Sequence, residues 1–521
     1  MEIPETFNVA AFFVDRNVSE GRGDKIAIEC EDDRISYLQL LQSTNRAGNA
    51  FRNLDVRVEE RVLLLLPDIP EFLYCFFGAI KIGAVAVPVS TSAKVHEYEH
   101  MLADSRAGVA VIHEDFLPLF QQIPKDRLRH LRHIVGAGAN PPSPPYPHLQ
   151  RLLEKASPDL SAEPTHKDDA AFWLYSSGST GAPKGCVHLH HDMVVCSELY
   201  AKGILHMTER DRCYSVARLF FAYGLGNAGY FPLSVGAATI LSPPRPTPET
   251  IYSTIERHRP TLFFSVPTNF AALLAHRRGT GLDFDLSSIR NAISAGEGLP
   301  ALIFEQFRQR FGVEILDALG STETLHVVIA NGPGEARPGS SGKLIPGYEA
   351  RITDENGNAV ATDEIGDLLI RGDSTCAAYW NQHEKSKDTF AGHWFRTGDK
   401  YRQDRDGYFW HAGRSDDLFK VNGRWLSPVE VESALIAHPA VKEAAVIARD
   451  DEFGLAKPAA YVVTKSDYNA DAQMVTALQQ WVAEKLGGYK QPRWIEFLPE
   501  IPKTATGKLQ RFKLRQLQKS S

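Results

Sequence analysis

The stretch Y-S-S-G-S-T-G-A-P-K-G, residues Tyr175–Gly185, contains three glycines, four serine or threonine residues and one lysine. In such a loop, backbone N–H groups and hydroxyls can approach anionic oxygens closely, because few Cβ atoms intervene. The preceding AAFWLYSS is typical of a strand, and the following HHDMVVCSELYAKGIL is typical of a helix. A strand, a glycine loop and a helix in this order form a phosphate-binding arrangement. We therefore favour a phosphate-binding loop over the alternative, a flexible surface turn.

The loop does not match the two best-known phosphate-binding patterns. A P-loop requires G-x-x-x-x-G-K-[ST], whereas Lys184 follows Pro183 and precedes Gly185. The dinucleotide pattern G-x-G-x-x-G is also absent from this stretch. The sequence therefore predicts that phosphates are held in another way.

Four later motifs carry side chains suited to the rest of a nucleotide. DALGSTET, residues Asp317–Thr324, offers a glycine turn, hydroxyls and Glu323, whose carboxylate could ligate Mg²⁺. FRTGDKY places Asp399 in a turn, where its two oxygens could accept both ribose hydroxyls. AGRSDD carries Arg414, and PKTATGKLQR carries Lys508 among small residues. Each motif alone has a plain structural explanation, but their combination favours a nucleotide site.

Composition narrows the class of protein. A chain of 521 residues is too long for one core, so we expect two or more domains. The net charge of −7 argues against a general nucleic-acid binder. The six cysteines lack C-x-x-C spacing, and no secretory signal pattern is visible, so we expect reduced thiols and a cytoplasmic location. Lys81 and Pro88 interrupt the apolar run FLYCFFGAIKIGAVAVPVS, which favours a core helix and a buried strand over a membrane span.

The pattern of apolar runs predicts an α/β fold with two domains. RVLLLLPD, AVAVPVS, AGVAVIHED, ATILSPP, TLFFSVP and VEILDALG each indicate a buried strand, and helical stretches separate them, which is typical of parallel-rich sheets flanked by helices. Near Gly413 the pattern changes to short strands and a helix capped by Ser427, with Pro428 at its first position and Glu430 completing a capping box. We predict a large N-terminal domain at residues 1–413 and a small, mobile α+β domain at residues 414–521.

Taken in order, these motifs resemble those of the adenylate-forming enzymes, which include acyl-CoA and aryl-CoA synthetases, non-ribosomal adenylation domains and luciferases. YSSGSTGAPKG is similar to the family's phosphate loop, LGSTE to its adenine and Mg²⁺ motif, RTGD to its ribose motif, GRSDDLFKVNG to its hinge and PKTATGK to the motif of its catalytic lysine. RLFFAYGLGNA, SAGEGLP and LGSTETLH narrow the resemblance to benzoate–CoA ligases and hydroxybenzoate relatives. The sequence departs from the family pattern at Asn422, at Arg424, and at Leu319, where many relatives have an aromatic residue.

The resemblance implies an AMP-forming ligase. An aromatic acid (benzoate, or a hydroxy- or amino-benzoate) would react with ATP to give an aroyl-adenylate and pyrophosphate, and coenzyme A would then displace AMP. Lys508 would bridge the acid and the α-phosphate, and the small domain would rotate about Asp416 between the two steps. By the same resemblance, Lys508, Thr180 and Glu323 are the catalytic residues, and Glu323 is the Mg²⁺ ligand. The implied nucleotide- and CoA-binding residues are Ser176, Ser177, Gly178, Ser179, Thr180, Lys184, Gly296, Glu297, Gly298, Asp317, Gly320, Ser321, Thr322, Asp399, Arg414, Lys420 and Gly423. The implied walls of the acid pocket are Ala222, Tyr223, Leu319 and His326.

Several alternatives stay open at this point. His326 is equally well explained as a hydrogen-bonded packing residue. An aryl-acid enzyme that loads a separate carrier protein is the main rival, whereas amino acid substrates are disfavoured by Ala222 and Tyr223, which stand where amino-acid-activating relatives have an aspartate. A non-catalytic nucleotide-binding protein is the other rival. We expect small-molecule partners, no nucleic acid and no membrane, and either a monomer or a homodimer.

Overall fold

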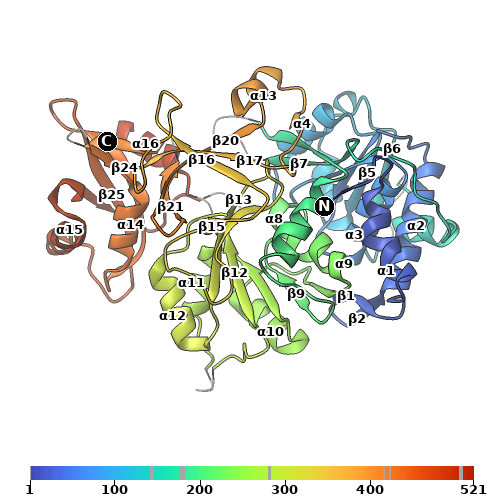
Figure 1. The fold of residues 1–521 in the computed structure, drawn as a ribbon, viewed down its shortest axis with the longest axis horizontal. Coiled ribbons are helices and arrows are strands. Elements are labelled where there is room, and N and C mark those ends of the chain that lie inside the picture. Colours follow the sequence, from blue (N-terminus) through green and yellow to red (C-terminus); the bar gives the residue numbers. More distant parts are fainter. Residues whose placement is uncertain are drawn as a thin grey trace.

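A computed structural model describes residues 2–140, 146–176, 182–279, 283–414, 417–421, 424–503 and 509–520. Figure 1 shows most of the chain in a large N-terminal part, with the C-terminal elements (orange to red) gathered at one end. In the described ranges, no helix is long and apolar enough to cross a bilayer. The apolar run interrupted by Lys81 forms α3 (Pro70–Lys81) and β4 (Val85–Pro88), as predicted.

A seven-stranded sheet carries the glycine-rich stretch. Its strand order is β18-β8-β7-β4-β3-β5-β6. Neighbouring strands from β7 to β6 are parallel, whereas β8 is antiparallel to both of its neighbours. The strands are β3 (Arg61–Leu65), β4, β5 (Val109–His113), β6 (His133–Ala137), β7 (Ala170–Ser176), β8 (Lys184–Leu189) and β18 (Ala378–Tyr379).

A 14-stranded sheet carries the other nucleotide motifs. Its order is β16-β17-β20-β21-β15-β14-β13-β12-β11-β9-β10-β1-β2, with β19 on β20. The pairs from β13 to β1 are parallel, and the remaining pairs are antiparallel. The strands are β1 (Ile26–Cys30), β2 (Asp33–Ser36), β9 (Arg212–Ser215), β10 (Ala238–Leu241), β11 (Leu262–Ser265), β12 (Asn291–Ala295), β13 (Ile315–Gly320), β14 (Val327–Ala330), β15 (Gly342–Leu344), β16 (Glu349–Thr353), β17 (Gly366–Arg371), β19 (Phe390–Ala391), β20 (Trp394–Gln403) and β21 (Tyr408–Arg414).

One hydrophobic core joins the two sheets. It combines buried residues of both sheets with those of α2 (Tyr37–Asn53), α3 and α7 (Asp192–Cys196). A second cluster packs α10 (Pro248–His258), α11 (Pro267–Ala275) and α12 (Ala301–Phe311) against the large sheet, and a third packs α4 (Val95–Ser105) against the smaller one. The shorter helices are α1 (Arg16–Ser19), α5 (Leu117–Phe120), α6 (Leu149–Lys155), α8 (Ala222–Gly224), α9 (Phe231–Val235) and α13 (His383–Thr389).

The C-terminal part has its own small core. Its elements are β22 (Phe419–Val421), β23 (Arg424–Leu426), α14 (Pro428–Ile436), β24 (Val441–Asp450), β25 (Ala456–Thr464), α15 (Ala472–Leu486), β26 (Trp494–Phe497) and α16 (Arg511–Ser520). As predicted, Ser427 caps α14, and its side chain accepts the Glu430 N–H. The carboxylate of Glu430 instead bonds Lys490 Nζ at 2.6 Å. Strand β21 of the large sheet ends at Arg414, so a domain boundary between residues 413 and 414 stays a prediction.

Candidate active site

The two described ends of the glycine-rich stretch belong to two strands that pair with each other. Strands β7 and β8 pair antiparallel with Ser176 opposite Lys184, and α7 begins only at Asp192. The helix predicted in HHDMVVCSELYAKGIL is confirmed by α7, but the strand β8 between the loop and this helix was not predicted. Residues 184–189 form a strand because they pair with β7 on one side and β18 on the other. Ser177, Gly178, Ser179 and Thr180 lie outside the described residues, so their predicted phosphate contacts stay predictions.

Lys184 and Glu323 meet, and a third residue joins them. Lys184 Nζ lies 3.7 Å from Glu323 Oε1. The Tyr379 hydroxyl donates to the same oxygen at 2.7 Å, and Lys184 Nζ lies 4.3 Å from the centre of the Tyr379 ring. Burial and the neighbouring Glu323 raise the pKa of Tyr379, so its hydroxyl stays a proton donor. We call Lys184, Glu323 and Tyr379 the three-segment cluster, because they come from β8, the turn after β13, and β18.

Glu323 is suited to a divalent cation that also binds phosphate. Only 13% of its side chain is exposed, and both contacts given above use Oε1, so Oε2 remains for a metal ligand bond. In the described ranges no cluster of three or more metal-binding side chains occurs. Mg²⁺ commonly binds through one or two carboxylates together with substrate phosphates and waters. A single carboxylate paired with Lys184 could therefore hold Mg²⁺ carried by a nucleotide.

The turn that carries Glu323 is tightly built. Ser321 N donates to Thr324 Oγ1 at 3.1 Å, and Thr324 N donates to Ser321 Oγ at 3.2 Å. A Cβ on Gly320 would lie 2.5 Å from the backbone oxygen of His326, so only glycine fits there. Asp317, earlier on β13, is buried and its Oδ1 has no hydrogen-bond partner among the described residues. Burial raises the pKa of Asp317 well above its usual range.

Tyr223 and His326, predicted as walls of the acid pocket, are in contact. His326 Nε2 donates to the Tyr223 backbone oxygen at 3.2 Å and to Asn227 Oδ1 at 3.1 Å, and the rings of Tyr223 and His326 lie 5.5 Å apart. Burial lowers the pKa of His326 to about 3, so the ring is neutral near pH 7. Its Nδ1 is buried without a partner among the described residues. Ala222 begins the same short helix as Tyr223, and Leu319 lies on β13.

Asp399 and Arg414 form what we call the hairpin pair. They are register partners on β20 and β21, and Arg414 Nη1 lies 3.1 Å from Asp399 Oδ1. Asp399 N donates to Thr397 Oγ1 at 3.0 Å. Gly398 has φ +73°, and a Cβ there would lie 2.9 Å from Arg414 Nη2. The strand register thus brings together the two residues predicted to bind ribose.

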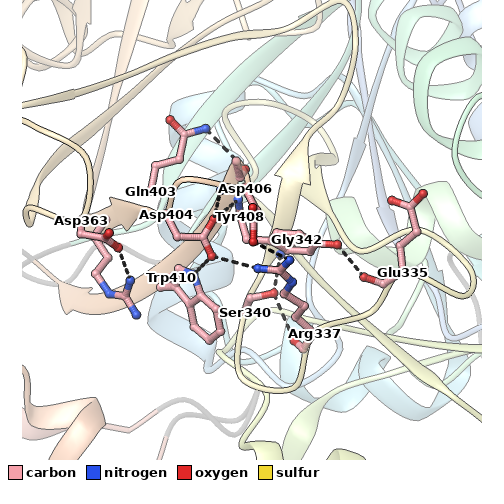
Figure 2. A network of polar contacts seen from close by, with 12 residues as sticks. Glu335, Arg337, Ser340, Gly342, Asp363, Gln403, Asp404, Asp406, Tyr408 and Trp410 are labelled. Carbon is pink, nitrogen blue, oxygen red and sulfur yellow. Dashed lines mark hydrogen bonds and ion pairs between the residues drawn. The ribbon is translucent and has the colours of Figure 1, made fainter.

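A polar network anchors the far end of this hairpin (Figure 2). Asp404 Oδ2 accepts from Trp410 Nε1 at 2.9 Å and from Arg337 Nη1 at 3.3 Å. Asp404 Oδ1 accepts the backbone N–H groups of Asp406 and Tyr408. Arg337 also stacks over the Tyr408 ring at 3.9 Å. These contacts fasten the turn between β20 and β21 to the loop before β15, and so hold the strands that carry the hairpin pair.

The turn after β12 lies beside the hairpin. Gly296 has φ +94°, and a Cβ on Gly298 would lie 3.7 Å from His411 Nδ1 on β21. Burial alone would lower the pKa of Arg511 on α16, but nearby carboxylates outweigh burial and raise this pKa. Glu432 and Asp417 contribute most, and Glu297 contributes less. Gly296–Gly298 therefore lies between the large sheet and the C-terminal part.

Two family models match the chain. The AMP-binding enzyme family matches residues 14–380, and the C-terminal domain of AMP-binding enzymes matches residues 430–508. The chain belongs to the AMP-binding enzyme family.

Individual relatives of this AMP-binding enzyme cover its full length. A benzoate–CoA ligase of Thauera aromatica is 46% identical over 517 residues, which are 99% of this chain and 97% of that protein. A 4-hydroxybenzoate–CoA/benzoate–CoA ligase of Rhodopseudomonas palustris is 42% identical, covering 98% of this chain and 94% of that protein. The anthranilate CoA ligase AuaEII, solved with anthranoyl-AMP, superposes with a TM-score of 0.95 and 42% identity, covering 100% of this chain and 99% of the other. The predicted resemblance to aryl-CoA ligases and the predicted fold class are confirmed.

The C-terminal part of this AMP-binding enzyme holds the segment that follows the predicted hinge. Asp417 Oδ2 lies 3.3 Å from Arg511 Nη1, and Asp417 Oδ1 lies 2.6 Å from Arg515 Nη2. Arg511 also binds Glu432 of α14 at 2.7 Å. Any rotation about the preceding residue would therefore carry Asp417 with the C-terminal part. Asp416 itself lies outside the described residues, so its role as the hinge stays a prediction.

The loop of the predicted catalytic lysine is described only at its two ends. Lys503 and Leu509 form an antiparallel bridge across it, and Lys503 Nζ lies 2.9 Å from Glu443 Oε2 on β24. Lys508 and Gly423 lie outside the described residues, and so does the side chain of Lys420. Their roles stay predictions. Tyr379, a member of the three-segment cluster, was not predicted from the sequence.

Proposed function

We propose that this protein joins an aromatic carboxylic acid to coenzyme A in two ATP-dependent steps. The acid first attacks the α-phosphate of ATP, giving an aroyl-adenylate and releasing pyrophosphate. The CoA thiolate then attacks the adenylate carbonyl, and AMP leaves as the thioester forms. The observation that carries this proposal is the pairing of Lys184 with Glu323 and of Asp399 with Arg414, in a chain 46% identical to a benzoate–CoA ligase over its whole length.

In the first step an anion approaches a polyanion, so fixed positive charge and oriented donors dominate catalysis. Lys184 supplies a cation that Glu323 and the Tyr379 ring hold in place. The carboxylate of Glu323 would hold Mg²⁺ delivered with ATP. When bound, Mg²⁺ neutralises charge on the phosphates. Asp399 would accept the ribose hydroxyls, with Arg414 orienting its carboxylate.

The ring of the acid would lie against Tyr223 and His326. Neutral His326 adds no charge to this surface, which suits an uncharged aromatic ring. The buried Nδ1 of His326 is an acceptor without a partner among the described residues, which supports including hydroxy- and amino-benzoates beside benzoate as substrates. A site built to hydrogen-bond a substrate group strongly rejects an analogue that lacks this group.

The second step would follow a rotation of the C-terminal part about Asp416. Lys508 would act in adenylation and withdraw afterwards, and the segment around Gly423 would then face the CoA pantetheine. The domain division at residues 413 and 414, and the mobility of the small domain, belong to this proposal. The free state of the cysteines that the structure describes fits a cytoplasmic location, which we also propose.

A substrate panel tests the function. AMP formation is measured with ATP, Mg²⁺ and CoA in the presence of benzoate, hydroxy- and amino-benzoates, phenylacetate, cinnamates and short fatty acids. We expect turnover with benzoates and little with fatty acids. Turnover confined to fatty acids would contradict the proposal. Pyrophosphate release that requires a carrier protein and ignores CoA would support the carrier-loading alternative instead.

The alternation of domains needs a separate test. We expect Lys508→Ala to abolish adenylation while leaving thioester formation from supplied aroyl-adenylate largely intact. Single-turnover measurements of each step decide this. Equal loss in both steps would contradict alternation.

A further inference from the structure

A buried histidine and aspartate lie directly behind the three-segment cluster. His188 Nε2 lies 2.8 Å from the backbone oxygen of Thr322, and His188 Nδ1 lies 2.7 Å from Asp192 Oδ2. Both side chains are fully buried, with no exposed area. A ring nitrogen must carry hydrogen to donate to a carbonyl oxygen, so the bond to Thr322 requires hydrogen on Nε2. His188 therefore bonds the residue immediately before Glu323.

The surroundings fix the histidine ring in one orientation. Asp192 Oδ2 also accepts the Leu189 N–H at 3.1 Å, which holds the carboxylate. The Phe172 ring stacks on His188 with centroids 5.2 Å apart and an interplanar angle of 18°. Nε2 donates to Thr322, and Nδ1 shares a hydrogen with Asp192 Oδ2, so both ring nitrogens are held.

Strand β8 therefore contacts the Glu323 turn at two points. Lys184 and His188 are four residues apart on one strand, so their side chains leave the same face. Lys184 contacts the Glu323 carboxylate, and His188 contacts the adjoining peptide. Leu325 N also donates to the Thr322 oxygen at 3.1 Å. This oxygen therefore accepts one bond from His188 and one from within the turn.

We propose that His188, held by Asp192, is a positioning residue that fixes the Thr322–Glu323 peptide for the ATP-dependent step. This inference rests on the proposed function, because it assigns the peptide to the phosphate and Mg²⁺ end of ATP. His188 does not touch the nucleotide in this role. It sets the direction of the backbone from which the Thr322 and Glu323 side chains project.

The test compares H188Q with the matched control H190Q. His190 is also a buried histidine bonded to a backbone group, but its partner is Val9 N, at 3.1 Å from Nδ1, and not a residue of the Glu323 turn. The measurements are ATP–pyrophosphate exchange at varied MgATP and at varied aromatic acid. Amide hydrogen exchange of residues 320–326 is followed in the nucleotide-free protein, with thermal melting as a measure of folding.

For H188Q we expect kcat/KM for MgATP to fall about 10- to 100-fold, as for other outer partners that orient metal or substrate ligands. The KM for the aromatic acid should stay unchanged, and amide exchange at residues 320–326 should become faster. H190Q should leave both the MgATP parameters and this exchange as in the wild type, whatever its effect on melting. Equal MgATP parameters in folded H188Q and H190Q would overturn the proposal.

D192A provides a second route should H188Q fail to fold. It removes the carboxyl group that holds His188 Nδ1, whereas an asparagine amide could still pair with Nδ1 and keep the ring in place. We expect a smaller loss in kcat/KM for MgATP than in H188Q, again with faster exchange at residues 320–326. Folded D192A with wild-type MgATP kinetics and exchange would refute the positioning role. Absence of pyrophosphate exchange in the wild type would instead refute the proposed function, and amide exchange would still test the hold of His188 on the turn.

Discussion

Asp399 and Arg414 face each other across one hairpin, whereas Lys184, Glu323 and Tyr379 come from three segments far apart in the chain. In the hairpin pair, the register of β20 and β21 is enough to bring the two side chains together. In the three-segment cluster, contact requires β18 to pair with β8 and the turn after β13 to lie against both. The first contact depends on local structure, and the second depends on the packing of the whole N-terminal part.

This difference suggests how each end of the site responds to mutation. The hairpin pair keeps its geometry as long as the hairpin forms, so distant changes should affect it weakly. In the three-segment cluster, the Lys184 cation and the Tyr379 hydroxyl both contact one carboxylate oxygen, Glu323 Oε1. Losing one member leaves the others partly buried and without their partner, which is costly.

The largest effect is expected for E323Q. The amide removes the negative charge that pairs with Lys184 and that would hold Mg²⁺, so we expect kcat for adenylation to fall about 100- to 1000-fold, the range found when a preorganised electrostatic group is removed. Pyrophosphate exchange measures this loss.

The matched control is E335Q, because Glu335 is an exposed glutamate paired with Lys343 on the surface. We expect E335Q to retain activity. A loss in E323Q no larger than in E335Q would show that the three-segment cluster does not serve adenylation.

Much of this arrangement could be predicted from the sequence. The runs RVLLLLPD and VEILDALG predicted β3 and β13 because continuous apolar residues ending in turn residues mark buried parallel strands. The chemical types and order of Lys184, Glu323, Asp399 and Arg414 indicated a nucleotide site. The strand inferences used single short segments, whereas the nucleotide site was inferred from the order of motifs along the chain.

The features that were not predicted from the sequence depend on contacts with residues far along the chain. The segment at residues 184–189 is a strand because it pairs with β7 on one side and, on the other, with β18, almost two hundred residues later. Tyr379 could not be predicted as a site residue for the same reason, since a two-residue strand has no periodic pattern of its own. His188 was not singled out in the sequence, because its partner Thr322 lies 134 residues away.

An intermediate loss of activity is expected for Y379F, which removes the Tyr379 hydroxyl from the three-segment cluster. The change deletes one hydrogen bond to a charged oxygen and keeps the ring beneath Lys184. Such bonds contribute roughly 1.5–3 kcal/mol, so we expect about a tenfold or greater loss in kcat/KM for MgATP. The KM for the aromatic acid should not change. Wild-type kinetics in Y379F would mean that Lys184 alone orients Glu323, and that two segments build this end of the site.

The smallest effect on catalysis is expected for D404N, at the far end of the hairpin. Asp404 accepts bonds from Trp410, Arg337 and two backbone amides, and the amide can replace only some of them. We expect the free energy of unfolding to fall by about 1–3 kcal/mol. The KM for ATP should rise much less than in D399N, which alters the hairpin pair itself.

The pH dependence of the unfolding free energy tests whether the ionised Asp404 carboxylate causes the stability loss in D404N. Burial alone would raise the pKa of Asp404, but hydrogen bonds from Trp410, Tyr408 and Asp406 outweigh it and lower the pKa. A lowered folded-state pKa means that the ionised carboxylate stabilises the fold above the pKa of the unfolded chain, and that this stabilisation is lost on acidification. The difference in unfolding free energy between wild type and D404N, measured by denaturant titration, should therefore shrink as the pH falls. D363N, which alters the exposed pair with Arg402 in the same region, should show little difference at any pH. If D404N raised the KM for ATP as much as D399N does, the hairpin pair would depend on the distant network and would not be set by strand register alone.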